Sequence, residues 1–228
     1  MSRVETENTT VELQEGGKSV SLSLRLFKPL PDMEGPGKGW TVVLVHQYSV
    51  LGGCKALLKG MATCLAVKGF LSITFDMRGV KRSTGKSTLT GSSEVHDVVA
   101  VCNWAAKEYP DHRILLVGSS AGAPIAGSAV DKVENVVAYV GLGYPFGCLA
   151  SILFSGHHRP ILESTKPKLF VMGTKDGFTS VKQLENKLKS AAGRVETHLI
   201  PGVGHFEMEG PFYDDQMATL IADFSKTI

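Results

Sequence analysis

The chain alternates apolar segments of strand length with longer segments of helical periodicity. Residues 41–49, TVVLVHQYS, begin with a continuous apolar run, which is typical of a strand covered on both faces. Residues 54–69 carry apolar side chains at helical spacing and end at a glycine. Because parallel strands need a crossover connection, usually a helix, this alternation predicts a mostly parallel sheet. The predicted strands are residues 22–30, 41–49, 70–79, 113–120, 135–143, 168–176 and 194–205, the predicted helices are 54–69, 92–110, 121–133, 179–193 and 211–228, and residues 30–39 form a hairpin or loop.

The length of the chain suits a single folded unit. It has 228 residues, and one hydrophobic core can grow to roughly 250–300 residues before a chain divides into domains. Hydrophobic residues make up 43% of the sequence and charged residues 20%, which is ordinary for a globular protein. We therefore expect an α/β fold in which residues 1–228 form one domain, with helices on both faces of the central sheet.

Charge, hydropathy and cysteine positions argue against several other classes of protein. The formal net charge is +2 without a long block of like charges, so nucleic acid is not an expected partner. No apolar run approaches the roughly 18 residues of a membrane helix, and the polar N-terminal segment lacks the apolar core of a secretory signal. Cys54, Cys64, Cys102 and Cys148 show neither metal-site spacing nor a disulfide framework. We expect a protein of the cytoplasm, or alternatively of the nucleus. We expect it to bind no metal ion, cofactor, nucleic acid or membrane.

Residues 113–122, RILLVGSSAG, join a predicted strand to a predicted helix. Gly118 and Gly122 flank Ser120 two positions away on either side, which makes the pattern G-x-S-x-G. In this motif a sharp turn exposes the serine hydroxyl, and the next backbone N–H, here that of Ala121, contributes to an oxyanion hole. The alternative is a glycine-rich turn that cradles a phosphate, although the usual glycine patterns of phosphate binding are absent.

Partners for Ser120 follow in the order serine, acid, histidine that this motif requires. Asp176 ends a predicted strand, and His205 lies in a loop before the last predicted helix. Both lie near the carboxyl ends of strands, where the sites of open α/β sheets gather. A histidine there can take the serine proton while the aspartate orients it. Taken singly, Asp176 is equally well explained as a cap or turn residue and His205 as a loop histidine, but all three in order favour catalysis.

The segments that resemble a known family are LVHQYSVLGG, FDMRGVKRSTGKS, LLVGSSAGAP, LFVMGTKDGF and PGVGHF. They resemble the α/β-hydrolase superfamily over nearly the whole chain, which implies Ser120 as nucleophile, His205 as base and Asp176 as orienting acid. The chain is most similar to compact, lid-poor proteins such as dienelactone hydrolases. It is also similar to a subgroup of small hydrolase-like proteins, some associated with chromatin-regulating complexes, and residues 141–146, GLGYPF, favour this second resemblance. Not every member of that subgroup is an established enzyme.

The resemblance also assigns two loops. Many family members begin the loop after the third strand with His-Gly, which gives a second oxyanion N–H. Here Gln47 follows His46, so the resemblance implies Gln47 or Tyr48 as this donor. Residues 76–83, DMRGVKRS, match the family's D-x-R-G-x-G-x-S stretch, with Lys81 in place of the second glycine, and that loop is usually structural.

Few residues remain for a cap over the predicted site. Two helices and two strands use most of the chain between the serine and the aspartate, which leaves a short cap-like insert at about 144–164. We therefore expect an open or shallow site, with the cap short or absent, suited to small or soluble acyl substrates. Candidate acyl-pocket residues in the insert are Phe146, Leu149 and Phe154. The alternative is that these side chains pack the insert onto the core.

Two other groups of polar residues have less specific patterns. His157 and His158 are adjacent without further ligands at metal-binding spacing, which is typical of a solvated loop. Glu94 and Asp97 lie on the helix before the nucleophile strand and are expected to face solvent.

The sequence thus predicts a serine hydrolase that cleaves a small or soluble carboxylic ester or thioester through an acyl-enzyme. Its expected partner is a small-molecule acyl substrate, and the sequence is compatible with a monomer or a homodimer. One alternative is a non-catalytic scaffold or ligand-binding protein on the same fold. Another is a different reaction of the same triad, such as acyl transfer or peptide cleavage.

Overall fold

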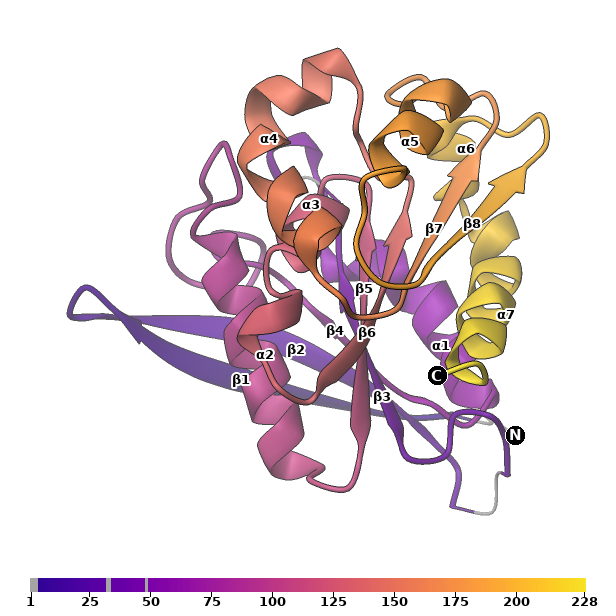
Figure 1. The fold of residues 1–228 in the computed structure, drawn as a ribbon. Coiled ribbons are helices and arrows are strands. Elements are labelled where there is room, and N and C mark those ends of the chain that lie inside the picture. Colours follow the sequence, from indigo (N-terminus) through magenta and orange to yellow (C-terminus); the bar gives the residue numbers. More distant parts are fainter. Residues whose placement is uncertain (1–3, 32–33, 48) are drawn as a thin grey trace.

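The computed structural model describes residues 4–31, 34–47 and 49–228, which form one eight-stranded sheet and its covering helices (Figure 1). The strand order is β1-β2-β4-β3-β5-β6-β7-β8. Neighbouring strands from β4 to β8 in this order are parallel, whereas β2 is antiparallel to both β1 and β4. The predicted mostly parallel sheet is confirmed. The strands are β1 Val4–Glu15, β2 Lys18–Pro29, β3 Trp40–Val45, β4 Leu71–Phe75, β5 Arg113–Ser119, β6 Val136–Leu142, β7 Lys168–Gly173 and β8 Val195–Ile200.

The central strands are buried on both faces, as their continuous apolar sequences predict. In β3, Val42 and Leu44 belong to one hydrophobic core, while Val43 and Val45 belong to the other. Successive side chains of a strand point to opposite faces, so one apolar run supplies both cores. Because packing on both faces holds the strands in position, it also positions the start of each loop that follows a strand.

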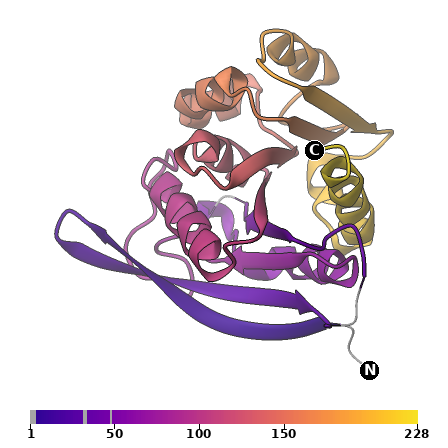
Figure 2. The ribbon, with the colours of Figure 1, turned by 60° about the horizontal axis from the view of Figure 1, so that its bottom comes forward.

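Helices cover both faces of the sheet, as predicted (Figure 2). Helices α1 (Lys59–Val67) and α7 (Asp214–Ser225) pack against each other and share one hydrophobic core. Helices α2 (Glu94–Glu108), α3 (Gly122–Gly127), α4 (Cys148–Glu163) and α5 (Val181–Leu188) contribute to the core on the other face. Across the described chain, no helix combines the length and the apolar character needed to cross a bilayer.

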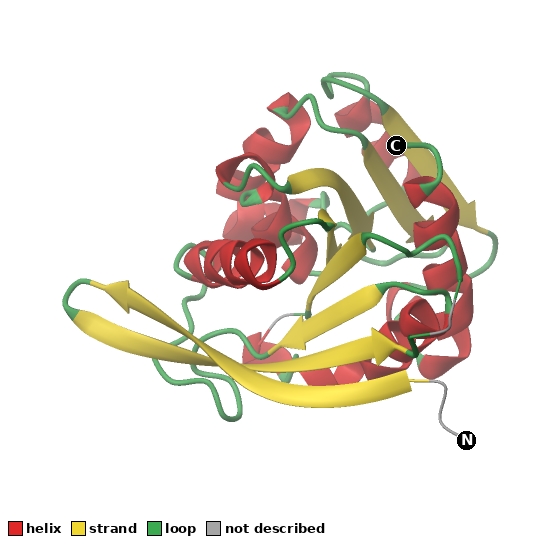
Figure 3. Cartoon of the chain, turned by 90° about the horizontal axis from the view of Figure 1, so that it is seen from below, coloured by secondary structure: helices red, strands yellow, loops and turns green. Residues whose placement is uncertain are grey.

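Residues 4–15 form a strand that was not predicted from the sequence. Strand β1 pairs with β2 along its whole length, from Val4 opposite Pro29 to Glu15 opposite Lys18. The connecting residues Gly16 and Gly17 have φ angles of 56° and 75°, which a two-residue hairpin turn requires and glycine adopts without strain. The tip of this hairpin extends beyond the rest of the sheet (Figure 3).

The segment expected as a cap-like insert is the crossover helix between β6 and β7. Helix α4 covers residues 148–163 and packs against α3 on a face of the sheet. The residues expected to form a cap instead connect the parallel strands β6 and β7. The described chain therefore has the predicted fold without a lid.

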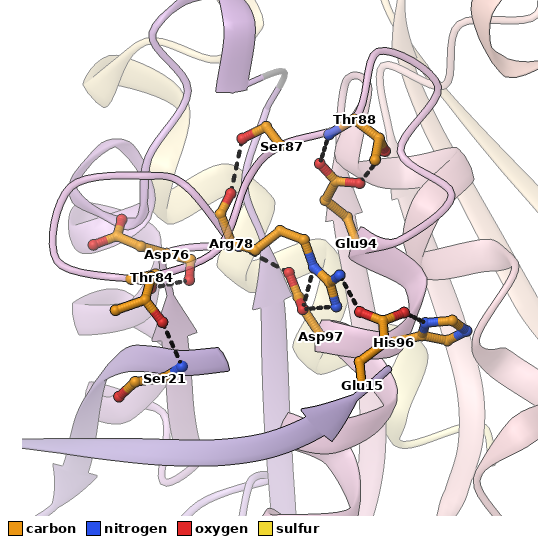
Figure 4. A network of polar contacts seen from close by, with 11 residues as sticks. Glu15, Ser21, Asp76, Arg78, Thr84, Ser87, Thr88, Glu94, His96 and Asp97 are labelled. Atoms are coloured by element: carbon orange, nitrogen blue, oxygen red, sulfur yellow. Dashed lines mark hydrogen bonds and ion pairs between the residues drawn. The ribbon is translucent and has the colours of Figure 1, made fainter. Parts of the chain in front are cut away.

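The loop after β4 is held by buried polar contacts, as its resemblance to a structural family loop implies (Figure 4). The Ser83 hydroxyl donates to the Asp76 carbonyl at 2.6 Å. The Arg78 backbone N–H and its Nε donate to the two carboxylate oxygens of Asp97 at 2.8 and 2.9 Å. Lys81 has a φ of 49°, a left-handed conformation that explains why glycine is common at its position in the family pattern.

The expectation that Glu94 and Asp97 face solvent is wrong. Glu94 and Asp97 are only 1% and 0% exposed, because both carboxylates form hydrogen bonds with the loop after β4. Glu94 Oε1 accepts the backbone N–H of Thr88 at 2.6 Å. Helix α2 therefore presents two buried acids to polar groups of the loop after β4, and helical periodicity cannot distinguish such a face from a solvated one.

Candidate active site

Ser120 lies at the turn between β5 and α3. Its φ is 50°, a left-handed conformation that is rare for a residue with a side chain. The turn is fixed by two hydrogen bonds: the Ser120 N–H donates to the Leu142 carbonyl at 2.8 Å, and the Ala123 N–H donates to the Ser120 carbonyl at 2.9 Å. A strained residue in a sharp strand-to-helix turn is the geometry of a nucleophile elbow.

The two glycines of the motif are required by close backbone contacts. A Cβ atom at Gly118 would lie 2.5 Å from the Cα of Ala123, and one at Gly122 would lie 2.3 Å from the carbonyl oxygen of His46. Neither space can hold a methyl group. The spacing G-x-S-x-G therefore reflects where α3 crosses β5 and the loop after β3.

We expect Gly122→Ala to lower the free energy of unfolding by about 1–3 kcal/mol, because the new methyl group pushes on the backbone of the loop after β3. Gly156→Ala is the matched control, since Gly156 lies in α4 and a Cβ atom there would meet nothing within 4 Å. Alanine in that open helical position should stabilise the protein by about 0.5–1 kcal/mol. Urea unfolding of both variants checks this, and equal effects would contradict the packing argument.

The structure brings the three predicted catalytic residues into one hydrogen-bonded chain. The Ser120 hydroxyl oxygen lies 2.8 Å from His205 Nε2, and His205 Nδ1 lies 2.6 Å from Asp176 Oδ2. The side chains of His205 and Asp176 are only 2% and 1% exposed. Since Asp176 binds Nδ1, the neutral imidazole carries its proton there and presents Nε2 as an acceptor to the serine.

Asp176 is held in place by the loop that follows β7. Its Oδ1 accepts the backbone N–H groups of Phe178 at 2.7 Å and Thr179 at 3.0 Å. This leaves Oδ2 for His205. The turn role considered for Asp176 from the sequence and the catalytic role are therefore compatible, because one oxygen serves each.

The predicted oxyanion residues lie on two adjacent loops. Ala121 immediately precedes α3, so its N–H is one of those a helix leaves without an internal partner. His46 fixes the other loop: its Nε2 accepts the Met77 N–H at 3.1 Å, and its Nδ1 is 2.7 Å from the Gln47 carbonyl oxygen. Burial lowers the pKa of His46 to about 4, so this ring is a neutral structural group. Tyr48, the other predicted donor, lies outside the described residues.

Glu209 is a site residue that was not predicted from the sequence. Its Oε1 accepts a hydrogen bond from the Ser119 hydroxyl at 3.0 Å, and its side chain is also hydrogen-bonded to the Gln47 side chain. Its Oε1 lies 4.0 Å from His205 Nε2, and burial raises the pKa of Glu209. The signal was the spacing of four residues between His205 and Glu209, which places two side chains on the same side of a helical turn. The Ser119 hydroxyl is thus hydrogen-bonded to Glu209, whereas the Ser120 hydroxyl is hydrogen-bonded to His205.

Two of the predicted acyl-pocket residues are buried in the structure. Phe146 and Phe154 are 3% and 4% exposed, and the Phe146 ring stacks on Tyr144 with centroids 4.0 Å apart. They pack the segment onto the core, which is the alternative that the sequence left open. The side chain of Leu149 lies outside the described part of the structure.

His157 and His158 are buried in α4, so the expectation of a solvated loop is wrong. His157 Nδ1 lies 2.7 Å from the Ser128 hydroxyl and its Nε2 lies 2.7 Å from the Thr90 carbonyl. His158 packs against the ring of Phe146 at 5.0 Å. Among the described residues, no group of three or more His, Cys, Asp or Glu side chains is placed to hold a metal ion.

Solved structures of similar fold come from several organisms. An α/β serine hydrolase homologue from Coxiella burnetii has a TM-score of 0.73 and 21% identity, covering 94% of this chain and 96% of that chain. A serine hydrolase without a lid from Xanthomonas campestris has a TM-score of 0.74 and 19% identity, covering 97% and 94%. An esterase from Pyrococcus furiosus has a TM-score of 0.77 and 21% identity, covering 97% and 91%. At these identities the likeness shows the fold.

Sequence comparison gives a local match and a family. An uncharacterized 31.7 kDa protein of the traX-finO intergenic region of Escherichia coli is 33% identical over 106 residues, which are 45% of this chain and 36% of that protein. The match thus spans about a third of the curated relative's length. A family model described as an alpha/beta hydrolase domain matches residues 51–211, a segment that includes Ser120, Asp176 and His205. Because this match covers most of the chain and the fold agrees, the chain belongs to the alpha/beta hydrolase family.

Proposed function

We propose that the protein is a serine hydrolase that cleaves small or soluble carboxylic esters or thioesters. The observation that carries the proposal is the hydrogen-bonded chain from Ser120 through His205 to Asp176. A serine that is hydrogen-bonded to an oriented histidine at a strained turn is the arrangement of an activated nucleophile. The serine hydrolases and esterases among the structures of similar fold support the same reaction class.

In the first half of the reaction, Ser120 Oγ attacks the acyl carbon while His205 Nε2 takes the hydroxyl proton. The resulting oxyanion is stabilised by two backbone N–H groups. One is that of Ala121, and the other is that of Gln47 in the loop after β3. Asp176 keeps the imidazole oriented and stabilises its charged form. The bond to the leaving group then breaks, and the proton on Nε2 moves to the departing oxygen or sulfur.

In the second half, water replaces the leaving group. His205 Nε2 takes a proton from this water, whose oxygen attacks the acyl carbon of the ester on Ser120. Collapse of the second tetrahedral intermediate returns the proton to Ser120 Oγ and releases the carboxylic acid. Each proton taken by the imidazole is thus passed on within the same half-reaction, first to the leaving group and then to Ser120 Oγ.

The surroundings of the elbow favour a short acyl group. A small cavity lies beside Ser119 and is lined also by Gln47, Leu57 and Met208, with room for about one water molecule. Ser120 and His205 are not among its lining residues, so it limits an acyl chain only in the direction of Ser119, where a long chain does not fit without rearrangement. The lidless fold supports soluble substrates over lipid aggregates, since no described segment forms a cover that an interface would open.

The test of the proposal is the release of carboxylic acid from p-nitrophenyl acetate, butyrate and laurate and from a short acyl thioester. We expect hydrolysis of the acetate, butyrate and thioester and a fall in kcat/KM at the laurate. The control is His205→Ala, which keeps the serine but removes its base. If the folded wild-type protein were no faster than this variant on every substrate, the proposal would fail and the non-catalytic interpretation would replace it.

A further inference from the structure

Two phenylalanine side chains lie exposed beside the catalytic histidine. Phe178 is 37% exposed and Phe206 is 70% exposed, although both are large and apolar. Their rings pack edge to face with centroids 5.6 Å apart. Single exposed apolar residues are ordinary, but two that contact each other at a candidate site form a small apolar surface.

Both rings also contact the imidazole of His205. The Phe178 ring lies 4.6 Å from the His205 ring and the Phe206 ring lies 5.4 Å from it, each in an edge-to-face arrangement. Three rings thus form one cluster, in which the imidazole is buried and the two phenyl rings reach solvent. An apolar surface is therefore fixed next to the group that transfers the proton.

Phe178 and Phe206 are both close to the predicted catalytic residues along the backbone. The Phe178 N–H donates to Asp176 Oδ1 at 2.7 Å, so the carboxylate that orients His205 also holds the backbone from which the first ring extends. Phe206 directly follows His205 at the start of α6 (His205–Met208). The Glu207 side chain accepts the Gly204 N–H at 3.2 Å, which caps this short helix. The backbone that carries each ring is therefore tied directly to a predicted catalytic residue.

Reaction chemistry determines which part of a substrate meets this surface. When the first tetrahedral intermediate collapses, the bond from the acyl carbon to the leaving oxygen breaks and that oxygen takes the proton from His205 Nε2. The leaving group must therefore lie on the histidine side of Ser120. The acyl group lies on the serine and stays there after the alcohol has left.

We propose that Phe178 and Phe206 form a leaving-group subsite that selects esters of aromatic alcohols. The inference rests on the proposed function and adds the class of alcohol to it. Aromatic rings pack favourably edge to face or offset, and each such contact typically changes an equilibrium or a rate by about 2- to 10-fold. The short acyl group of the proposed function and this aromatic surface together describe a substrate with a small acyl group on a larger, apolar alcohol.

The test compares benzyl acetate with methyl acetate, which differ only in the alcohol and give the same acetyl-enzyme. The readout is the ratio of the two kcat/KM values within each protein, so that any general effect on His205 cancels. We expect wild type to prefer benzyl acetate, and Phe206→Ala and Phe178→Ala each to lower the ratio by about 2- to 10-fold. Phe206→Leu should give an intermediate ratio, since it keeps apolar area without an aromatic face.

The matched control is Phe212→Ala. Phe212 is 89% exposed, and the aromatic partner of its ring is Tyr213, with centroids 5.2 Å apart. Its replacement should leave the ratio at the wild-type value. Hydrolysis of both esters with the same ratio in wild type and both variants would overturn the subsite while leaving the proposed function intact. If wild type hydrolysed neither of these esters and none of the acyl substrates above, both the subsite and the proposed function would be overturned.

Discussion

Replacement of Ser120 by alanine is expected to lower kcat/KM for short acyl esters by on the order of 10⁴- to 10⁶-fold. In the proposed mechanism the hydroxyl oxygen of Ser120 bonds to the acyl carbon, and no other described hydroxyl lies within hydrogen-bond distance of His205 Nε2. The fold should persist, because alanine keeps the Cβ atom and the backbone hydrogen bonds of the turn. Steady-state hydrolysis measures the loss, and circular dichroism checks the fold.

Ser119→Ala is the control that decides between the two adjacent serines. The Ser119 hydroxyl donates to Glu209 and is 3.0 Å from it, so its removal leaves the catalytic chain intact. We expect this variant to keep readily measurable turnover. Comparable losses in both variants would contradict the assignment of Ser120 as the only nucleophile.

Arg78→Met is expected to lower the free energy of unfolding by about 3–5 kcal/mol, because it leaves a buried carboxylate without its guanidinium partner. Asp97 is 0% exposed; the variant removes the hydrogen bond from Arg78 Nε and keeps the one from the Arg78 backbone N–H. Arg78 also binds Glu15 at the end of β1, so one guanidinium joins α2, the loop after β4 and the N-terminal hairpin. Guanidinium chloride unfolding measures the effect.

This loss should depend on pH with a defined sign. Burial raises the pKa of Asp97 to about 6 even though Arg78 opposes the shift, and removal of Arg78 raises it further. The unpaired charge is therefore fully present above that pKa, and it disappears as the carboxyl is protonated at lower pH. We expect the destabilisation to be larger at a pH of about 8 than at about 5.

Arg82→Met is the matched control for charge, since Arg82 lies exposed in the same loop. Its effect should stay within about 0.5 kcal/mol at either pH. A destabilisation by Arg78→Met that is small, or that grows as the pH falls, would contradict the account of a buried charge.

The parts of the site that could be predicted are those fixed by local chain geometry. The G-x-S-x-G spacing identifies Ser120 because only glycine fits where α3 crosses its neighbours. Asp176 follows the apolar strand β7 and His205 follows the more polar strand β8, and both were predicted as strands, so their place at the carboxyl edge of the sheet could be inferred. Their mutual distance follows from the strand order, which the sequence pattern does not specify.

The parts that could not be predicted depend on tertiary partners. Strand β1 alternates weakly and is mostly exposed, because an edge strand needs few apolar residues. Glu94 and Asp97 have the spacing of a solvated helix face, and only the position of the loop after β4 makes that face buried. Glu209 is a single acid after the histidine, and its role becomes visible once Ser119 and Gln47 lie beside it.

The central claim is that Ser120 is an activated nucleophile, and covalent labelling tests it most directly. The purified protein would be treated with a fluorophosphonate probe, and intact mass and peptide mapping would locate the adduct. We expect one adduct on Ser120, absent from Ser120→Ala and formed much more slowly in His205→Ala. No adduct on the folded wild-type protein, or an adduct on another residue, would contradict the claim.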